Sequence, residues 1–209
     1  MKNIIIYGAG GFGRETSLLL HQINLRSVQW NVLGYCDDGK TTGEKVDQFS
    51  VLGGMDYLNE TKEELHVAIA IADTETREKI KSQLTNPRLQ FPSLIHPSVF
   101  VNADCSVGEG SIICAGVFMT VNVHIGPFAI VNLKCTLGHD CVLESFSSLM
   151  PSVNVSGNVK IGKGVYVGAG AILLQGISIG DNSVVGAGAV VNKSFDNGKR
   201  IMGVPARAI

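Results

Sequence analysis

The side chains in this sequence that are best suited to chemistry are the adjacent His139 and Asp140, in the stretch LGHDCV at 137–142. An imidazole with a pKa near ~6.5 accepts a proton at neutral pH. A neighbouring carboxylate stabilises the imidazolium that forms and fixes the ring tautomer. The pair is therefore suited to general-base catalysis, in which His139 deprotonates an attacking amine or hydroxyl. His124 could line a cleft, and the other histidines are expected to be packing or surface residues: His21, His66 and His96.

A second chemical motif is the glycine pattern GxGxxG, formed by Gly8, Gly10 and Gly13 between a strand-like run and a helix-like run. Glycine lets the backbone approach a phosphate closely, and the N-terminus of a helix favours negative charge. The pattern usually marks a dinucleotide site, with an acid about 20 residues further on that contacts a ribose. Asp37 and Asp38 lie in about that place.

The segment around the glycine motif is too short for a complete dinucleotide-binding fold. Residues 1–90 alternate strand-like runs (3–8, 30–38, 64–71) with helix-like runs (13–23, 74–84), which predicts a parallel sheet. This is about one mononucleotide-binding half of the doubled fold, so a mononucleotide head group is favoured over NAD. Ala72 follows the third strand, on the same carboxyl edge as the glycines. The alternative is a docking domain whose glycines serve only packing.

The second helix of this segment has a candidate cap and a polar face. Thr74 is expected to cap its N-terminus, because a hydroxyl can accept a hydrogen bond from the first turn. Arg77 and Lys81 are expected on its exposed face.

From Ile95 onward the sequence repeats every six residues. Seventeen successive sixth positions, from Ile95 to Val191, are aliphatic, and the next residue is often glycine. This period does not suit a helix and is the signature of a hexapeptide parallel β-helix with three faces per coil. The aliphatic side chains are expected to point inward, and the following glycines to serve the tight corners. His139 falls in such a corner, where side chains project outward.

Bulk properties narrow the class of protein. The chain has 209 residues, 45% of them hydrophobic, and a net charge of -1, which gives no support for a nucleic-acid partner. No apolar run approaches the ~18 residues of a membrane span, and no signal peptide is evident, so a cytoplasmic protein is expected. The five cysteines form no CxxC pair, so buried small residues are favoured over a metal site or disulfides.

Several stretches together resemble one family, the left-handed β-helix (hexapeptide-repeat) sugar acyltransferases. They are IIIYGAGGFGRE at the start, GYCDD, AIADTETREKI, LIHPSV before the repeats, and the tail MGVPARAI. The resemblance covers essentially the whole chain, and it includes sialic-acid O-acetyltransferases and UDP-4-amino-sugar N-acetyltransferases. It implies a Rossmann-like α/β half domain (1–90), a left-handed parallel β-helix (91–194) and a C-terminal tail (195–209). It also implies a homotrimer that uses acetyl-CoA at clefts between neighbouring β-helices.

The resemblance also implies roles for individual residues. His139 matches the family's general base, and Asp140 matches the acid that modulates it. The glycine loop would hold the phosphates of a UDP-linked amino sugar, with the two aspartates near the uridine. The substrate-binding residues expected from the motifs and the resemblance are Gly8, Gly10, Gly11, Phe12, Gly13, Asp37, Asp38, Ala72 and Asn132. Those expected to contact acetyl-CoA are Ser148, Ala169 and Ala187, and Ser148 stands where some members have a second histidine.

Charge is consistent with a site for CoA in the C-terminal part. Residues 160–209 carry six basic and two acidic side chains, and Lys and Arg are natural partners for CoA phosphates. A solvated basic surface is the alternative. No metal is expected to take part.

Three functions remain open from the sequence. The expected one is acetyl-CoA-dependent N-acetylation of a UDP-linked amino sugar, by direct transfer with His139 as base. An O-acetyltransferase acting on sialic acid or another glycan precursor would use the same base. A β-helix used as a scaffold or sensor is the third reading, and it would not need the corner histidine.

Overall fold

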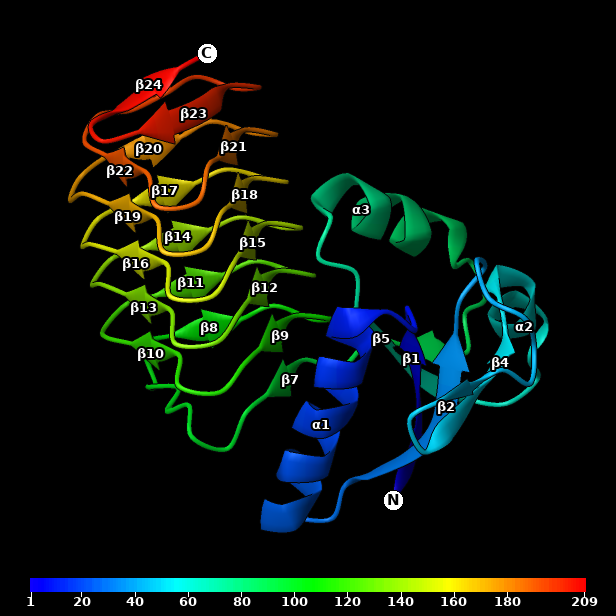
Figure 1. Ribbon diagram of the computed structural model, residues 1–209. Coiled ribbons are helices and arrows are strands. Elements are labelled where there is room, and N and C mark those ends of the chain that lie inside the picture. The colour runs from blue at the N-terminus through cyan, green and yellow to red at the C-terminus, as the bar shows by residue number, and fades with distance from the viewer. The chain divides into compact units, whose positions relative to one another are not determined.

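The computed structural model describes all 209 residues and divides into two compact units, Met1–Leu94 and Ile95–Ile209 (Figure 1). The division lies four residues beyond the boundary expected at 90/91. Residues 195–209, expected as a tail, contain two strands that join a sheet of the second unit. The fold class expected from the sequence, an α/β half domain followed by a parallel β-helix, is confirmed.

The first unit is built on one six-stranded sheet. Its strand order is β3-β4-β2-β1-β5-β6, and all neighbours are parallel except the β3–β4 hairpin. The central strands are apolar and buried, as expected for a parallel sheet. The strands are β1 (Lys2–Tyr7), β2 (Trp30–Cys36), β3 (Lys45–Val46), β4 (Phe49–Gly53), β5 (Leu65–Ile69) and β6 (Leu89–Gln90).

Three helices belong to this unit: α1 (Gly11–Arg26), α2 (Met55–Glu60) and α3 (Thr74–Gln83). Two expectations for α3 were wrong. Its N-cap is Asp73, whose carboxylate accepts a hydrogen bond from the Thr76 N–H at 2.9 Å, rather than Thr74. Arg77 is buried rather than exposed, because its guanidinium donates to backbone carbonyls of the loop before the helix.

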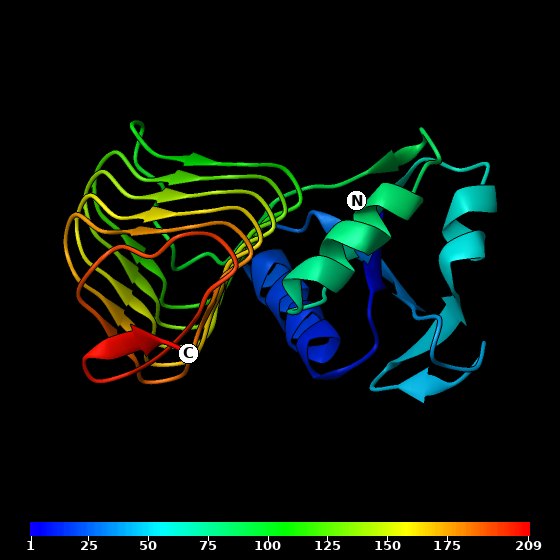
Figure 2. The ribbon, with the colours of Figure 1, turned by 90° about the horizontal axis from the view of Figure 1, so that it is seen from above.

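The second unit is a three-sided coil whose strands are mostly two residues long (Figures 1 and 2). Strands eighteen residues apart pair in parallel, which gives three sheets. We call them the β10 sheet (β10-β13-β16-β19-β22), the β8 sheet (β20-β17-β14-β11-β8) and the β7 sheet (β24-β23-β21-β18-β15-β12-β9-β7). The strands are β7 (Leu94–Ile95), β8 (Ser106–Val107), β9 (Ile112–Ile113), β10 (Phe118–Met119), β11 (His124–Ile125), β12 (Ile130–Val131), β13 (Thr136–Leu137), β14 (Val142–Leu143), β15 (Ser148–Leu149), β16 (Asn154–Val155), β17 (Lys160–Ile161), β18 (Tyr166–Val167), β19 (Ile172–Leu173), β20 (Ser178–Ile179), β21 (Val184–Val185), β22 (Val190–Val191), β23 (Arg200–Gly203) and β24 (Ala206–Ala208).

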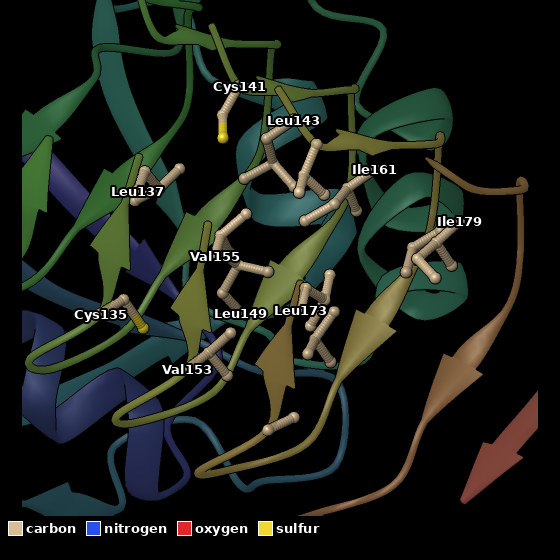
Figure 3. Packing of buried hydrophobic residues seen from close by; sticks show 14 of the residues in the cluster. Cys135, Leu137, Cys141, Leu143, Leu149, Val153, Val155, Ile161, Leu173 and Ile179 are labelled. Atoms are coloured by element: carbon tan, nitrogen blue, oxygen red, sulfur yellow. The ribbon is translucent and has the colours of Figure 1, made fainter. Parts of the chain in front are cut away.

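The six-residue aliphatic series forms the core of this coil. From Ile113 to Val191 each member is the second residue of a two-residue strand and is buried. Figure 3 shows Leu137, Leu143 and Leu149, from the three sheets of one coil, pointing into the interior. Each coil therefore covers the apolar surface of the next.

The glycine that follows the aliphatic residue has a different role from the one expected. Left-handed backbone occurs three positions after the aliphatic residue, as at Phe128 (φ 55°) and Asp140 (φ 60°). The glycines directly after it lie where a side chain would strike the next coil. A methyl group at Gly138 would lie 2.6 Å from the backbone nitrogen of Gly157. These glycines are needed for close stacking of coils rather than for their φ angles.

Shortening a side chain of this core should weaken the second unit. We expect Leu149→Ala to lower the free energy of unfolding by about 2–5 kcal/mol, because Leu149 is fully buried and the change leaves a cavity. Leu174→Ala is the matched control, with an expected loss below about 0.5 kcal/mol, because Leu174 is 41% exposed. Urea denaturation followed by circular dichroism measures both, and equal losses would contradict the inward register.

Candidate active site

His139 and Asp140 form a hydrogen-bonded pair at the corner between β13 and β14. The His139 Nδ1 lies 2.7 Å from the Asp140 Oδ2, and each side chain is 50% exposed. A carboxylate only accepts hydrogen bonds, so Nδ1 carries the proton and donates it. The other ring nitrogen, Nε2, is then left with a lone pair that can accept a proton from a substrate.

Gly157, one coil further along, fixes the position of the imidazole. A methyl group built on Gly157 would lie 2.6 Å from Cε1 and 2.7 Å from Cδ2 of His139, and closer still to Nε2. The ring therefore packs flat against the glycine, in space that any side chain would fill. The sequence contained a signal for this contact, because residues eighteen apart are neighbours on successive coils.

Asn122, one coil before the pair, holds the second oxygen of the Asp140 carboxylate. Its Nδ2 donates to the Asp140 Oδ1 at 2.7 Å. This hydrogen bond, followed by the one from His139, lowers the pKa of Asp140 below its ordinary value. Asp140 is therefore ionised near neutral pH and stabilises a protonated imidazole. Asn122 was not among the residues expected from the sequence, although the same eighteen-residue spacing points to it.

In the first unit, the four glycines of the loop divide into two pairs. A methyl group at Gly13 would overlap the carbonyl oxygen of Gly8, and Gly8 itself has a φ of 104°. These two glycines are required by the packing of helix α1 against the end of β1. At Gly10 and Gly11, at the N-terminus of α1, an added methyl group would have no atom within 4 Å. No packing contact explains these two glycines, and the space in front of them is open to a ligand.

The two aspartates after β2 brace the same carboxyl edge of the sheet. Asp37 accepts hydrogen bonds from the N–H groups of Ala9 (2.8 Å) and Gly39 (2.9 Å). Asp38 accepts from the Tyr7 hydroxyl and, at 2.8 Å, from the Met55 N–H. Each carboxylate has about four lone-pair sites, so capacity for a ribose hydroxyl remains. The structure thus gives both aspartates a structural role that was not expected from the sequence.

The loop after β5 completes this edge. The Arg77 guanidinium donates to the carbonyl oxygens of Ile71 at 2.5 Å and Ala72 at 3.2 Å. Burial lowers the pKa of Arg77 to about 9. Ala72 and Phe12 are both partly exposed, Ala72 after β5 and Phe12 in the first turn of α1. The glycine loop, the aspartates and Ala72 all follow the ends of adjacent parallel strands, as the sequence predicted.

The residues expected to contact acetyl-CoA, together with Asn132, which was expected to bind the substrate, lie elsewhere on the coil from His139. Asn132, Ala169 and Ala187 lie in corners between the β7 sheet and the β10 sheet, and Ser148 begins β15. His139 lies in the next corner, between the β10 and β8 sheets. One chain therefore places these residues along two different edges of the β-helix. The Asn132 Oδ1 accepts a hydrogen bond from the Leu133 N–H at 2.7 Å.

Two further features of the structure bear on function. No group of three or more His, Cys, Asp or Glu side chains is placed to hold a metal ion. None of the helices has the length and apolar character needed to cross a bilayer.

Comparisons with known proteins agree with this geometry. Residues 3–84 match the family model of the PglD N-terminal domain, and residues 158–193 match bacterial transferase hexapeptide repeats. GDP-perosamine N-acetyltransferase from Escherichia coli O157:H7 is 32% identical over 82% of this chain and 78% of its own length.

Two solved structures have the same fold over the whole chain. One is perosamine N-acetyltransferase from Caulobacter crescentus, a histidine-to-asparagine variant in complex with CoA and GDP-perosamine. It is 27% identical with a TM-score of 0.91, over 100% of this chain and 97% of its own. The other is the acetyltransferase domain of PglB from Neisseria gonorrhoeae FA1090 in complex with acetyl coenzyme A. It is 28% identical with a TM-score of 0.89, over 100% of this chain and 99% of its own.

The β-helix with its matched hexapeptide repeats, together with the acetyltransferases that share the fold, defines a hexapeptide-repeat acyltransferase. With the matched N-terminal domain, the chain belongs to the family of hexapeptide-repeat sugar acetyltransferases that includes GDP-perosamine N-acetyltransferase and PglB. The family and the enzyme class expected from the sequence are thereby confirmed.

The two pairs of glycines should differ in their effect on stability. We expect Gly13→Ala to destabilise the first unit by about 1–3 kcal/mol or more, because its methyl group has no space beside Gly8. Gly11→Ala is the control and should leave the melting temperature of the ligand-free protein unchanged or slightly raised. Thermal denaturation measures both variants. A stable Gly13→Ala protein would show that the helix does not pack this closely on β1.

Proposed function

We propose that this protein transfers the acetyl group of acetyl-CoA to the amine of a sugar linked to a nucleoside diphosphate. The observation that carries the proposal is the His139–Asp140 pair, whose ring packs on Gly157 with the Nε2 lone pair free. The relatives support it, because one is named as a GDP-perosamine N-acetyltransferase and others were solved with CoA or acetyl-CoA.

In the proposed mechanism the amine attacks the thioester carbonyl directly. A C–N bond forms, the C–S bond breaks, and no acyl-enzyme intermediate is needed. His139 accepts the proton that the amine loses, and the proton then neutralises the departing CoA thiolate. Asp140 stabilises the imidazolium while it exists. Holding both substrates in place supplies much of the rate enhancement, since positioning can contribute about 7–11 kcal/mol.

The nucleotide is proposed to bind at the carboxyl edge of the first unit's sheet. Its phosphates would approach Gly10 and Gly11 at the N-terminus of α1, where backbone N–H groups and the helix dipole favour negative charge. Asp37 and Asp38 would face the ribose. The relative with a named substrate uses a GDP-sugar, which favours guanosine over the uridine expected from the sequence.

Acetyl-CoA is proposed to bind between protomers of a homotrimer. His139 and the residues expected to contact acetyl-CoA lie along different edges of one β-helix, so a second chain is needed to bring them together. In this arrangement Ala169 and Ala187 contact the pantetheine arm, Ser148 the thioester, and Asn132 the acceptor sugar. Basic side chains after residue 160 would neutralise the phosphates of CoA.

Removing the base or displacing it should stop turnover while preserving the fold. We expect His139→Ala to reduce kcat by at least about 100-fold, within the range of general-base catalysis. Gly157→Ala should reduce kcat at least about tenfold, because its methyl group occupies the place of the imidazole. Ser156→Ala, in the same corner, is the control with near-normal kcat. A thiol-release assay with acetyl-CoA and GDP-perosamine measures all three, and full turnover in His139→Ala would remove this residue from the mechanism.

Nucleotide binding should identify the substrate class without turnover. We expect GDP to raise the melting temperature and Gly11→Ala to abolish that rise, because its methyl group fills the space in front of the helix. If UDP raises the melting temperature more than GDP does, a UDP-linked sugar is the substrate, as expected from the sequence. A rise in melting temperature with NAD alone would contradict a mononucleotide site. Comparing amino and hydroxy sugars in the thiol-release assay tests O-acetylation, since faster turnover of the hydroxy sugar would overturn the proposed amine acceptor.

A further inference from the structure

A chain of hydrogen bonds runs from the catalytic pair across two further coils of the β-helix. Asp140 accepts from Asn122, the Asn122 Oδ1 lies 3.0 Å from Nε2 of His124, and the His124 Nδ1 lies 2.9 Å from Oγ of Ser106. We propose that Asn122, His124 and Ser106 are positioning residues that hold Asp140 in the orientation in which it supports His139. This proposal rests on the proposed role of His139.

The chemistry of the groups fixes the direction of every bond in this chain. The Asp140 carboxylate only accepts, so Asn122 presents its NH₂ to Asp140 and its carbonyl oxygen to His124. That oxygen needs a donor, which assigns the proton of neutral His124 to Nε2. The free His124 Nδ1 then accepts from the Ser106 hydroxyl. All donors therefore point toward Asp140, an arrangement in which successive hydrogen bonds strengthen one another.

The result is a carboxylate held on both oxygens. Oδ1 is bound by Asn122 and Oδ2 by His139, so the plane of the carboxylate is fixed with respect to the imidazole. Asn122 is the largest contributor to the lowered pKa of Asp140, which agrees with a role in keeping that acid charged. Asn122 is itself held by His124, which prevents its amide from turning its oxygen toward Asp140.

A comparable chain on the same β-helix ends differently. The Thr136 hydroxyl donates to the Asn154 Oδ1 at 3.0 Å, but the Asn154 Nδ2 donates to the backbone carbonyl of Ser152. That chain braces a corner and reaches no acid. The chain through Asn122 instead ends on the acid beside the base, which points to a role in the reaction rather than in corner stability alone.

Substitutions at His124 separate a positioning role from a structural one. The amide nitrogen of glutamine can replace Nε2 of histidine, whereas that of asparagine lies nearer the place of Nδ1. We expect His124→Asn to lower kcat by about threefold to tenfold, the effect of losing one hydrogen bond, with KM for both substrates within twofold. His124→Gln should recover most of the wild-type kcat. The proposal would be overturned if both variants had the wild-type kcat. It would also be overturned if both lost kcat equally and had a lowered melting temperature, because that result indicates a purely structural role.

Asn122 offers an independent test. Its φ is 53°, so glycine can replace it without backbone strain while removing the amide. Asn122→Gly should lower kcat as His124→Asn does, and the double variant should lose little more, because both break the same chain. Additive losses would overturn the proposal. His139→Ala distinguishes a failure of the proposed function from a failure of the positioning proposal. If His139→Ala retains turnover, the proposed function is wrong. If His139→Ala loses turnover while the His124 and Asn122 variants keep normal kcat, only the positioning role is wrong.

The tautomer of His124 can be read without any activity measurement. Nitrogen-15 NMR of the wild-type protein near pH 8 should show the Nε2–H form of this ring. The Nδ1–H form would leave no donor for the Asn122 Oδ1 and would contradict the proposed chain of hydrogen bonds.

Discussion

The inward stacking of one aliphatic side chain every six residues is the constraint on which the rest of the second unit depends. It fixes three strands to each coil, and it therefore makes residues eighteen apart into neighbours. The contacts of the candidate site that join successive coils follow from that spacing. Gly157 lies beneath the His139 ring, and Asn122 reaches Asp140, because the core on the inside holds the coils in register.

Glycine serves two purposes in this chain. In the β-helix, Gly138 and Gly157 remove side chains so that protein can approach protein, either a neighbouring backbone or an imidazole. In the loop after β1, Gly8 and Gly13 do the same, whereas Gly10 and Gly11 face open space. A glycine-rich motif is therefore best divided by asking what a methyl group would strike at each position. Only the positions that strike nothing are candidates for contact with a ligand.

Much of the fold could be predicted from the sequence. The six-residue repeat of aliphatic residues and the alternation of strands and helices in residues 1–90 both follow directly from backbone geometry. The corner position of His139 followed from the same period. The burial of Arg77 could not be predicted, since its partners are backbone carbonyls of a loop that sequence pattern does not describe. Asn122 and Gly157 were not predicted, although each lies eighteen residues from its partner in the site. Their contacts become apparent only when residues on successive coils are compared, rather than residues in successive six-residue repeats. Nucleotide binding at the first unit and acetyl-CoA binding between protomers stay predictions, because a single chain without ligands shows neither.

Asp140 combines two demands in one residue. It adopts a φ of 60° to turn the corner, and its carboxylate supports the neighbouring imidazole. Among the residues that tolerate left-handed backbone readily, aspartate alone also carries a negative charge. Two requirements therefore restrict the residues that can replace Asp140. Glycine or asparagine would tolerate the left-handed backbone but lose the carboxylate. Glutamate would keep a carboxylate but strain the left-handed backbone. In the proposed mechanism, the basicity of His139 is consequently easier to adjust through Asn122 or His124, which lie behind Asp140, than through Asp140 itself.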